Sequence, residues 1–200
     1  MLLNVKQRQS KLKDLGFYKM SVDGIEGAGT RKAYKELQKR YFIRKADIDG
    51  LYGKNTDILL RSAWNVKTYC KNFKLEEFSC ECGGRGCTGY PAELNATLLK
   101  NLQSIRTKYG VAMVITSGVR CSWYNSRLSG SIKNSAHTKG KAVDFYSSKT
   151  KTLANRKNII DYAIKLPSMS YGYCNGYWRT KFRKGTTSAS YMGTSIHINV

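Results

Sequence analysis

The sequence predicts an α+β protein that divides into two parts, a small three-helix domain over residues 1–70 and a larger domain over residues 73–200. The first part contains an internal repeat, and the segments before and after each copy have apolar residues at helical spacing. The second part alternates amphipathic helices with short apolar strands, a pattern typical of a small, mostly antiparallel sheet flanked by helices. Polar and basic residues between 69 and 75 interrupt both patterns, so we place the join there.

The internal repeat consists of two glycine turns. DGIEGAGT at residues 23–30 recurs as DGLYGKNT at residues 49–56. Each copy combines an Asp-Gly turn, a second glycine and a threonine that is suited to cap a helix. We therefore expect helices over about 31–41 and 57–64, packed against an earlier helix over 5–15.

The larger domain is predicted to contain two helices and several short strands. The expected elements are a helix over 92–109, strands over 111–116 and 142–146, a helix over 153–166, a hairpin over 171–178 around Asn175-Gly176, and a strand over 195–200. The longest apolar stretch, near 111–115, is far too short to span a membrane.

The charge of the chain predicts a polyanionic partner. Lys and Arg number 35 against 13 Asp and Glu, which gives a net charge of +22. Nucleic acid and anionic wall polymers would both be attracted by such a charge. No recognised groove-reading motif accompanies it, so we do not expect nucleic acid. Aromatic residues between 171 and 178 either stack on sugars or form the core of the hairpin.

Six cysteines leave several possibilities open. They are Cys70, Cys80, Cys82, Cys87, Cys121 and Cys174. The glycine-rich segment 80–87 could form a structural zinc knuckle, a disulfide-stapled turn, or a loop with free thiols. The N-terminus turns polar at once and lacks the apolar segment of a secretory signal. Free thiols or a metal are therefore favoured over a disulfide framework.

The chain contains only two histidines, His137 and His197, and His137 shortly precedes Asp144. Two neutral imidazoles and one carboxylate, with a fourth position left to water, are a typical ligand set of catalytic zinc. Strand alternation places Asp144 on the face opposite Val143, and it places His197 on the same face as Asn199. The alternative is two unrelated surface histidines and a buried aspartate in a salt bridge.

The two glycine turns and their helices resemble the peptidoglycan-binding domain found on many wall hydrolases. The resemblance covers about the first 65 residues, and its specificity comes from the occurrence of the turn twice at similar spacing. It implies binding of a glycan strand or stem peptide in a shallow groove.

A second resemblance covers about residues 73–200. It is carried by FSCECGG at 78–84, SGVR at 117–120, Tyr124-Asn125, NSAH at 134–137, GKAVD at 140–144 and HINV at 197–200. In this order, these motifs resemble the zinc D-alanyl-D-alanine metallopeptidase family, particularly its branch of bacteriophage endolysins and bacterial wall hydrolases.

The resemblance implies roles for individual residues. His137, Asp144 and His197 are the expected zinc ligands. Arg120 is expected to contact the substrate or its developing oxyanion, although it could instead be a structural ion-pair partner. Ser135 is expected to bind substrate as well.

One position departs from the family pattern. The last motif commonly reads His-x-Asp, whereas this chain has Asn199, and Thr194 stands where related enzymes can carry aspartate. A neutral amide cannot accept a proton from water, so the general base stays unassigned. Three explanations are open: a base from elsewhere, an asparagine that only supports the ligands, or a weakened enzyme. We favour a base from elsewhere, with Glu76, Glu77, Glu81 and Glu93 as its candidates, or a reaction that strictly requires no base.

Together these features predict an endolysin-like, antimicrobial zinc metallopeptidase that hydrolyses an amide bond in the peptide part of peptidoglycan. The expected activity is of the D-Ala-D-Ala type, as a carboxypeptidase or an endopeptidase. We expect the protein to be made in the cytoplasm of an infected or producing bacterium, without a signal peptide, and to act on the wall. The alternative is a non-catalytic or weakened wall-binding protein with a vestigial zinc site.

Overall fold

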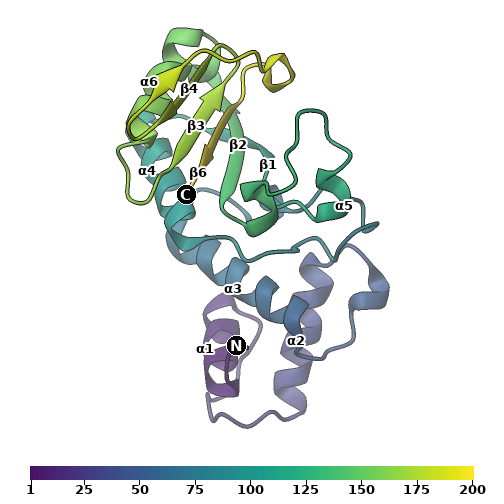
Figure 1. Cartoon of the computed structure of the whole chain (residues 1–200). Coiled ribbons are helices and arrows are strands. Elements are labelled where there is room, and N and C mark those ends of the chain that lie inside the picture. Colours follow the sequence, from purple (N-terminus) through teal and green to yellow (C-terminus); the bar gives the residue numbers. More distant parts are fainter.

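The computed structural model describes residues 1–200 and has the predicted α+β fold (Figure 1). The helices are α1 (Val5–Leu15), α2 (Ala28–Tyr41), α3 (Lys54–Tyr69), α4 (Ala96–Tyr109), α5 (Ser122–Asn125) and α6 (Leu153–Ala163). The strands are β1 (Met113–Ser117), β2 (Ala142–Ser147), β3 (Tyr171–Cys174), β4 (Tyr177–Thr180), β5 (Lys184–Gly185) and β6 (Ile196–Asn199). Short 3₁₀ helices are η1 (Lys45–Asp47), η2 (Leu75–Phe78), η3 (Ala136–Lys139), η4 (Ser148–Thr150) and η5 (Ser190–Met192).

Helices α1, α2 and α3 form the N-terminal unit. Helix α1 has the predicted bounds, and Asn4 caps it through a hydrogen bond from the Gln7 amide. Helices α2 and α3 begin earlier than predicted, because Gly27 and Gly53 occupy the N-cap positions. The expectation that the repeat threonines cap these helices was therefore wrong.

The first turn of the repeat is organised by a buried glutamine from α1. Gln9 Nε2 donates to Asp23 Oδ1 (2.8 Å) and lies 3.2 Å from Thr30 Oγ1. The side-chain oxygen of Gln9 accepts a hydrogen bond from the Gly24 amide (2.8 Å). Thr30 therefore lies within the first turn of α2, and its hydroxyl contacts Gln9, the glutamine that organises the glycine turn. It cannot be the N-cap because the helix has already begun at Ala28.

The second turn repeats this arrangement with a glutamine from α2. Gln38 Nε2 donates to Asp49 Oδ1 (2.8 Å) and lies 3.0 Å from Thr56 Oγ1, and Gln38 Oε1 accepts from the Gly50 amide (2.8 Å). The structural repeat is therefore longer than the sequence motif, since each unit includes one glutamine of the preceding helix.

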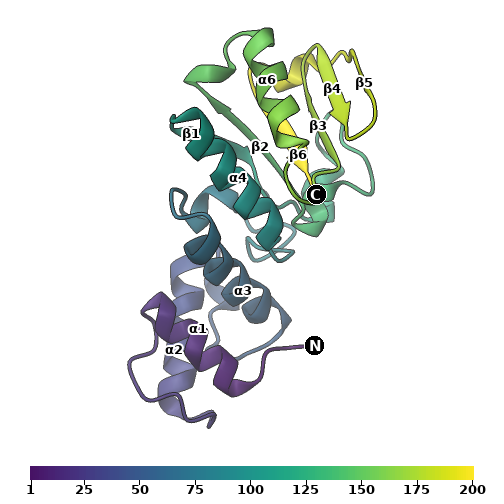
Figure 2. The same ribbon diagram turned by 90° about the vertical axis from the view of Figure 1, so that its left-hand side faces the viewer.

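All neighbouring strands of the sheet are antiparallel, in the order β1-β2-β6-β3-β4-β5. Helices α4 and α6 pack against each other, and α6 also contacts β3, β4 and β6 (Figure 2). A Cβ on Gly172 of β3 would lie 3.1 Å from Ile160 of α6, so a glycine here permits close packing of helix and sheet. The strand β5 was not predicted.

The register of the sheet places three polar side chains in one row. Asp144 of β2 lies opposite His197 of β6, and His197 lies opposite Tyr173 of β3. The adjacent residues Val143 and Ile198 point to the other face and are fully buried. Strand alternation thus separates the candidate site from the core beneath α6.

The two parts of the chain are joined by polar and apolar contacts. Asn65 of α3 donates to the Leu94 carbonyl (2.9 Å), and Ser62 Oγ accepts from the Leu94 amide (3.1 Å). A single cluster of buried hydrophobic residues runs from α1 to β6. The bounds 1–70 and 73–200 stay a prediction. None of the helices combines the length and apolar composition that a membrane crossing requires.

Candidate metal centre

His137, Asp144 and His197 converge from η3, β2 and β6, and all three are buried. His137 Nε2 lies 3.2 Å from His197 Nδ1 and 3.3 Å from Asp144 Oδ1. His197 Nδ1 lies 2.7 Å from the same carboxylate oxygen. Three donor atoms from distant parts of the chain thus form one small triangle.

This donor set fits a zinc ion. Bonds of about 2.1 Å to a tetrahedral zinc hold neighbouring ligand atoms roughly 3.4 Å apart. Two sides of the triangle are close to that separation and the third is shorter. Two imidazole nitrogens and one carboxylate oxygen are also the chemistry that zinc prefers when a fourth position stays open.

The tautomer of His137 is set by a backbone carbonyl. His137 Nδ1 lies 2.7 Å from the Gly118 oxygen, which can only accept, so Nδ1 carries the proton. The lone pair of Nε2 therefore faces Asp144 and His197. A Cβ on Gly118 would overlap the Phe78 backbone, so a glycine is needed to bring this carbonyl into place.

Asn199 orients the second histidine. Its amide nitrogen donates to Ser170 Oγ (2.8 Å), which leaves Asn199 Oδ1 facing His197 Nε2 at 3.3 Å. With Nε2 donating to this oxygen, the lone pair of His197 Nδ1 faces Asp144 and His137. Outer hydrogen bonds of this kind fix the tautomer and ring orientation of histidine ligands.

Asp144 is shared between the histidines and Arg120. Its Oδ2 accepts a hydrogen bond from Arg120 Nη2 (2.7 Å), and Arg120 Nε donates to Ser117 Oγ (2.7 Å). A register irregularity in β1 between Ile115 and Ser117 brings Ser117 opposite Asp144. Arg120 is thus an ion-pair partner of a candidate ligand and is held on two sides.

Burial and charge keep Asp144 and His137 in their metal-binding forms. Burial opposes ionisation of Asp144, but the electrostatic influence of the two neighbouring histidines outweighs it and holds the Asp144 pKa well below its usual range. Burial lowers the pKa of His137, against the attraction of Asp144. A carboxylate and a neutral imidazole are therefore present at neutral pH.

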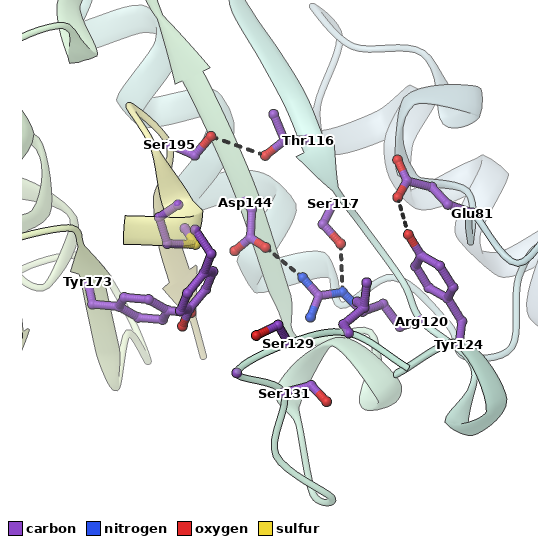
Figure 3. A pocket seen from close by; sticks show the side chains of 14 residues that line it. Glu81, Thr116, Ser117, Arg120, Tyr124, Ser129, Ser131, Asp144, Tyr173 and Ser195 are labelled. Carbon is purple, nitrogen blue, oxygen red and sulfur yellow. Dashed lines mark hydrogen bonds and ion pairs between the residues drawn. The ribbon is translucent and has the colours of Figure 1, made fainter. Parts of the chain in front are cut away.

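A cavity of about 460 Å³ lies beside this triangle (Figure 3). Asp144 and Arg120 line it, together with the loop 128–131 and Tyr191 of η5. Tyr173 also lines the cavity, and its ring centroid is 4.8 Å from that of His197. The cavity thus gives an extended substrate access to Asp144, whereas His137 and His197 lie behind its lining.

Glu81 and Tyr124 form another part of the cavity lining. Tyr124 donates its hydroxyl hydrogen to Glu81 Oε2 (2.7 Å). Glu81 and Asp144 are the only carboxylates that line the cavity. In Figure 3 the Glu81–Tyr124 pair and Asp144 appear on opposite sides of Arg120.

The other glutamates considered as bases are engaged elsewhere. Glu76 pairs with Arg40 of α2 (2.8 Å), and Glu77 accepts from the Lys74 amide (2.7 Å). Glu93 accepts from Asn65 of α3 (3.1 Å). None of the three lines the cavity.

The structure places Ser135 outside the cavity lining. Ser135 is buried, and its hydroxyl oxygen faces the His137 amide (3.4 Å) at the start of η3. Sequence reasoning missed Tyr191, whose hydroxyl lies 3.3 Å from that of Tyr173. The alternation of the hairpin could have indicated Tyr173, but no sequence signal distinguishes Tyr191.

Comparison with protein families agrees with the geometry. The model of peptidase M15 matches residues 71–172, which is half of the chain and includes His137 and Asp144. The chain belongs to the peptidase M15 family. This M15 match ends before His197, so the structure alone brings that histidine and Asn199 to the matched residues.

The N-terminal part has its own match. A peptidoglycan-binding domain model matches residues 3–56, which include both glycine turns. No curated protein matches the chain. The M15 family is the zinc D-Ala-D-Ala carboxypeptidase family, and the two matches together support a cell-wall peptidase.

Proposed function

We propose that this M15 chain is a zinc-dependent, endolysin-like peptidase that hydrolyses an amide bond in the peptide part of peptidoglycan. The bond we propose is of the D-Ala-D-Ala type, cut at a chain end or within a cross-link. The observation that carries the proposal is the convergence of His137, Asp144 and His197 beside Arg120 at the edge of a cavity.

The ligands we assign are His137 Nε2, Asp144 Oδ1 and His197 Nδ1. A zinc ion bound there would supply an activated water and polarise the scissile carbonyl. The three ligand atoms are preorganised for metal binding, because hydrogen bonds with Gly118 and Asn199 orient the two imidazole rings and Arg120 orients the carboxylate. Such preparation limits the reorganisation that metal binding requires.

Arg120 is the residue we assign to the substrate. Its guanidinium has five N–H donors, and the bonds to Asp144 and Ser117 use two of them. The remaining donors are available at the cavity for a stem-peptide carboxylate or for the oxyanion that develops on the scissile carbonyl. The ion pair with Asp144 and a contact with substrate are therefore compatible.

Glu81 is the proton acceptor we propose. It is the one carboxylate at the cavity that is not among the assigned ligands. The Tyr124 hydroxyl holds its Oε2 and leaves Oε1 free of a side-chain partner. Asn199 is then a support for His197, which explains why an amide suffices at that position.

The substrate polymer follows from both parts of the chain. The N-terminal match supports attachment to peptidoglycan, and the charge of +22 would draw the protein to anionic wall polymers. We propose that the protein is made in the bacterial cytoplasm and reaches the wall as a phage lysin does, through a membrane opened by another protein.

Loss of turbidity by purified bacterial walls tests the proposal. We expect the wild-type chain to clear the walls, chelation to stop clearing, and added zinc to restore it. His137→Ala should bind walls to the same extent without clearing them. Intact walls in the presence of wild-type protein and zinc would overturn the enzymatic proposal. Retained binding in that case would favour the alternative of a wall-binding protein, which Asn199 at the usual acidic position suggests.

A further inference from the structure

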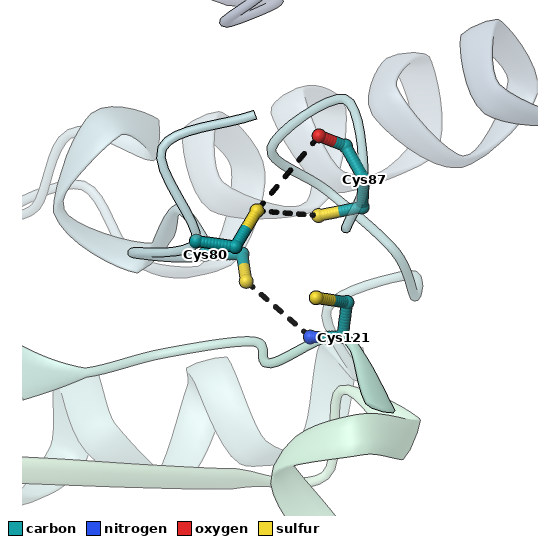
Figure 4. Close-up of side chains that lie close together, drawn as sticks. Cys80, Cys87 and Cys121 are labelled. Carbon is teal, nitrogen blue, oxygen red and sulfur yellow. Dashed lines mark hydrogen bonds between the residues drawn. The ribbon is translucent and has the colours of Figure 1, made fainter. Parts of the chain in front are cut away.

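Four of the six cysteines meet at the start of the larger part, away from the histidines. The sulfur atoms of Cys80, Cys82, Cys87 and Cys121 all lie within 4.8 Å of one another. The first three come from the loop after η2, and Cys121 follows β1 and precedes α5. Figure 4 shows Cys121 facing the loop that carries Cys80 and Cys87.

Glycines shape the loop so that its cysteines can meet. Gly83 and Gly84 have φ values of +59° and +81°, a left-handed conformation that side chains disfavour. A Cβ on Gly86 would lie 2.5 Å from Cys121 Sγ, so only a glycine allows the loop to approach that cysteine. The backbone of the loop 80–87 thus has the conformation that lets its three cysteines and Cys121 lie close together.

Backbone donors surround the sulfur atoms. The Cys121 amide donates to Cys80 Sγ (3.3 Å), and the Tyr124 amide donates to Cys121 Sγ (3.4 Å). Hydrogen bonds to an ionised acceptor are stronger than those to a neutral one, so these donors favour thiolates. Arg44 lies against the same loop, since a Cβ on Gly84 would lie 2.8 Å from its side chain.

All six cysteines are free in the structure, and Cys82 Sγ lies 3.5 Å from Cys87 Sγ. Zinc–sulfur bonds of about 2.3 Å hold neighbouring thiolates of a tetrahedral site roughly 3.8 Å apart. The observed separation is close to that value. Cys80, Cys82 and Cys121 are also buried, which keeps water from the cluster.

We propose that Cys80, Cys82, Cys87 and Cys121 bind a second, structural zinc ion as four thiolates. Binding releases the thiol protons to solvent and leaves no open position, so this ion takes no part in hydrolysis. Soft thiolate ligands select zinc over magnesium and calcium. The proposal goes beyond the activity proposed above and does not depend on it.

The four-cysteine site lies next to residues that line the cavity and next to the N-terminal unit, so a zinc ion bound there would have a structural role. Glu81 stands between two of the ligands, and Tyr124 lies in the helix that Cys121 begins. The same loop bonds to the N-terminal unit, because the Ile43 amide donates to the Thr88 carbonyl (3.1 Å). A zinc ion here would therefore fix the positions of Glu81 and Tyr124 at the cavity. It would also fix the loop that contacts the N-terminal unit.

The metal content of the purified full chain, prepared with zinc and a reductant, tests the proposal. We expect two zinc ions per wild-type chain and one in the double variant His137→Ala/His197→Ala, which leaves every cysteine in place. X-ray absorption of that variant should show zinc bound only by sulfur at about 2.3 Å. Cobalt(II) in its place should give a strong sulfur-to-metal charge-transfer band.

Cysteine variants supply the complementary comparison. Cys82→Ser/Cys87→Ser should lose one zinc ion, whereas Cys174→Ser, a buried cysteine outside the cluster, should keep both. If the cysteine pair variant does not fold, the histidine variant still decides the question. No zinc in the histidine variant, nitrogen or oxygen ligation of its zinc, or a Cys82–Cys87 disulfide in protein purified without reductant would overturn the proposal.

Discussion

The side chain of Asn199 makes two contacts that together set its orientation. Ser170 accepts from its amide nitrogen, and its oxygen therefore faces His197 Nε2. Neither Asn199 nor its neighbour His197 belongs to the cavity lining. Because its oxygen faces His197 Nε2, we assign Asn199 to orienting this candidate ligand.

This role predicts the effect of replacing Asn199. Asn199→Ala should weaken zinc binding about 10- to 100-fold, because His197 loses the acceptor that directs its ring. Asn199→Asp should retain zinc and should not raise turnover. A competition titration with a zinc chelator measures the affinities, with Asn175→Ala as a control outside the site. Unchanged affinity in Asn199→Ala, or a large gain in turnover in Asn199→Asp, would contradict the assignment.

Glu81 is tested by removing only its charge. Glu81→Gln should lower kcat on wall peptides about 10²- to 10⁴-fold, the contribution typical of a general base. The zinc content should not change. Glu76→Gln is the matched control, because Glu76 pairs with Arg40 outside the cavity. Turnover of Glu81→Gln within a few-fold of wild type would show that the proton is accepted elsewhere.

At the scale of secondary-structure elements, each glycine turn depends on one glutamine. Gln38 is buried and bonds to the side chains or backbone of Asp49, Gly50, Leu51 and Thr56. The sequence motif revealed both turns but not this partner, since the glutamine lies in the preceding helix at a different spacing in the two copies.

Removing that glutamine should destabilise the N-terminal unit. Gln38→Ala should lower the free energy of unfolding by about 1–3 kcal/mol, because buried donors and acceptors of the turn lose their partner. Gln103→Ala, at a half-buried glutamine on α4 whose hydrogen bonds lie at the surface, should change it by less than about 0.5 kcal/mol. Urea denaturation compares the two variants. Equal small effects would mean that the turns hold their shape without the glutamine.

Helix α3 carries a buried carboxylate, Asp57, that binds the backbone at the start of the chain. Asp57 accepts from the Leu3 amide (2.9 Å), the Tyr52 hydroxyl (2.7 Å) and Arg61 Nε (2.6 Å). Burial opposes its ionisation, but these three hydrogen bonds and the charge of Arg61 outweigh it and lower the Asp57 pKa. The folded state therefore binds a proton at Asp57 less readily than the unfolded state does.

The sign of this shift predicts a pH dependence. Stability contributed by Asp57 is fully present above its unfolded pKa of about 3.9 and is lost as the pH falls through the lower folded pKa. Asp57→Asn should therefore have a lower Tm than wild type at pH 6, and the difference should shrink toward pH 2. Thermal unfolding followed by circular dichroism measures it. A Tm difference that stays constant with pH would contradict the account.

The alternation of residues along each strand predicted which way Asp144 and His197 face, but it did not predict that the two residues lie side by side. Counting along each strand correctly put Asp144 and His197 on faces away from the apolar residues. Their pairing in register is a contact between segments far apart in the chain, which no local pattern encodes. The contact between Asn199 and His197 also depends on Ser170, which lies in the loop before β3.

At the scale of the whole molecule, the two parts are packed against each other around one continuous core. The N-terminal unit contacts α4 through α3 and the cysteine loop through Ile43. Binding to the wall by the first part would therefore hold the cavity of the second in a restricted orientation. The anionic partner that composition indicates stays a prediction. The approach of Cys121 to the earlier cysteine loop could be seen only in the tertiary structure.

Cleavage of peptide bonds of peptidoglycan at the His137–Asp144–His197 site is the central proposal for this protein. Mass spectrometry of fragments released from walls of known composition tests this claim most directly. We predict peptide fragments with a newly freed amine or carboxylate and intact glycan linkages, produced by wild-type protein with zinc and absent with His197→Ala. Fragments cleaved in the glycan strand, or the same peptide fragments from His197→Ala, would contradict it.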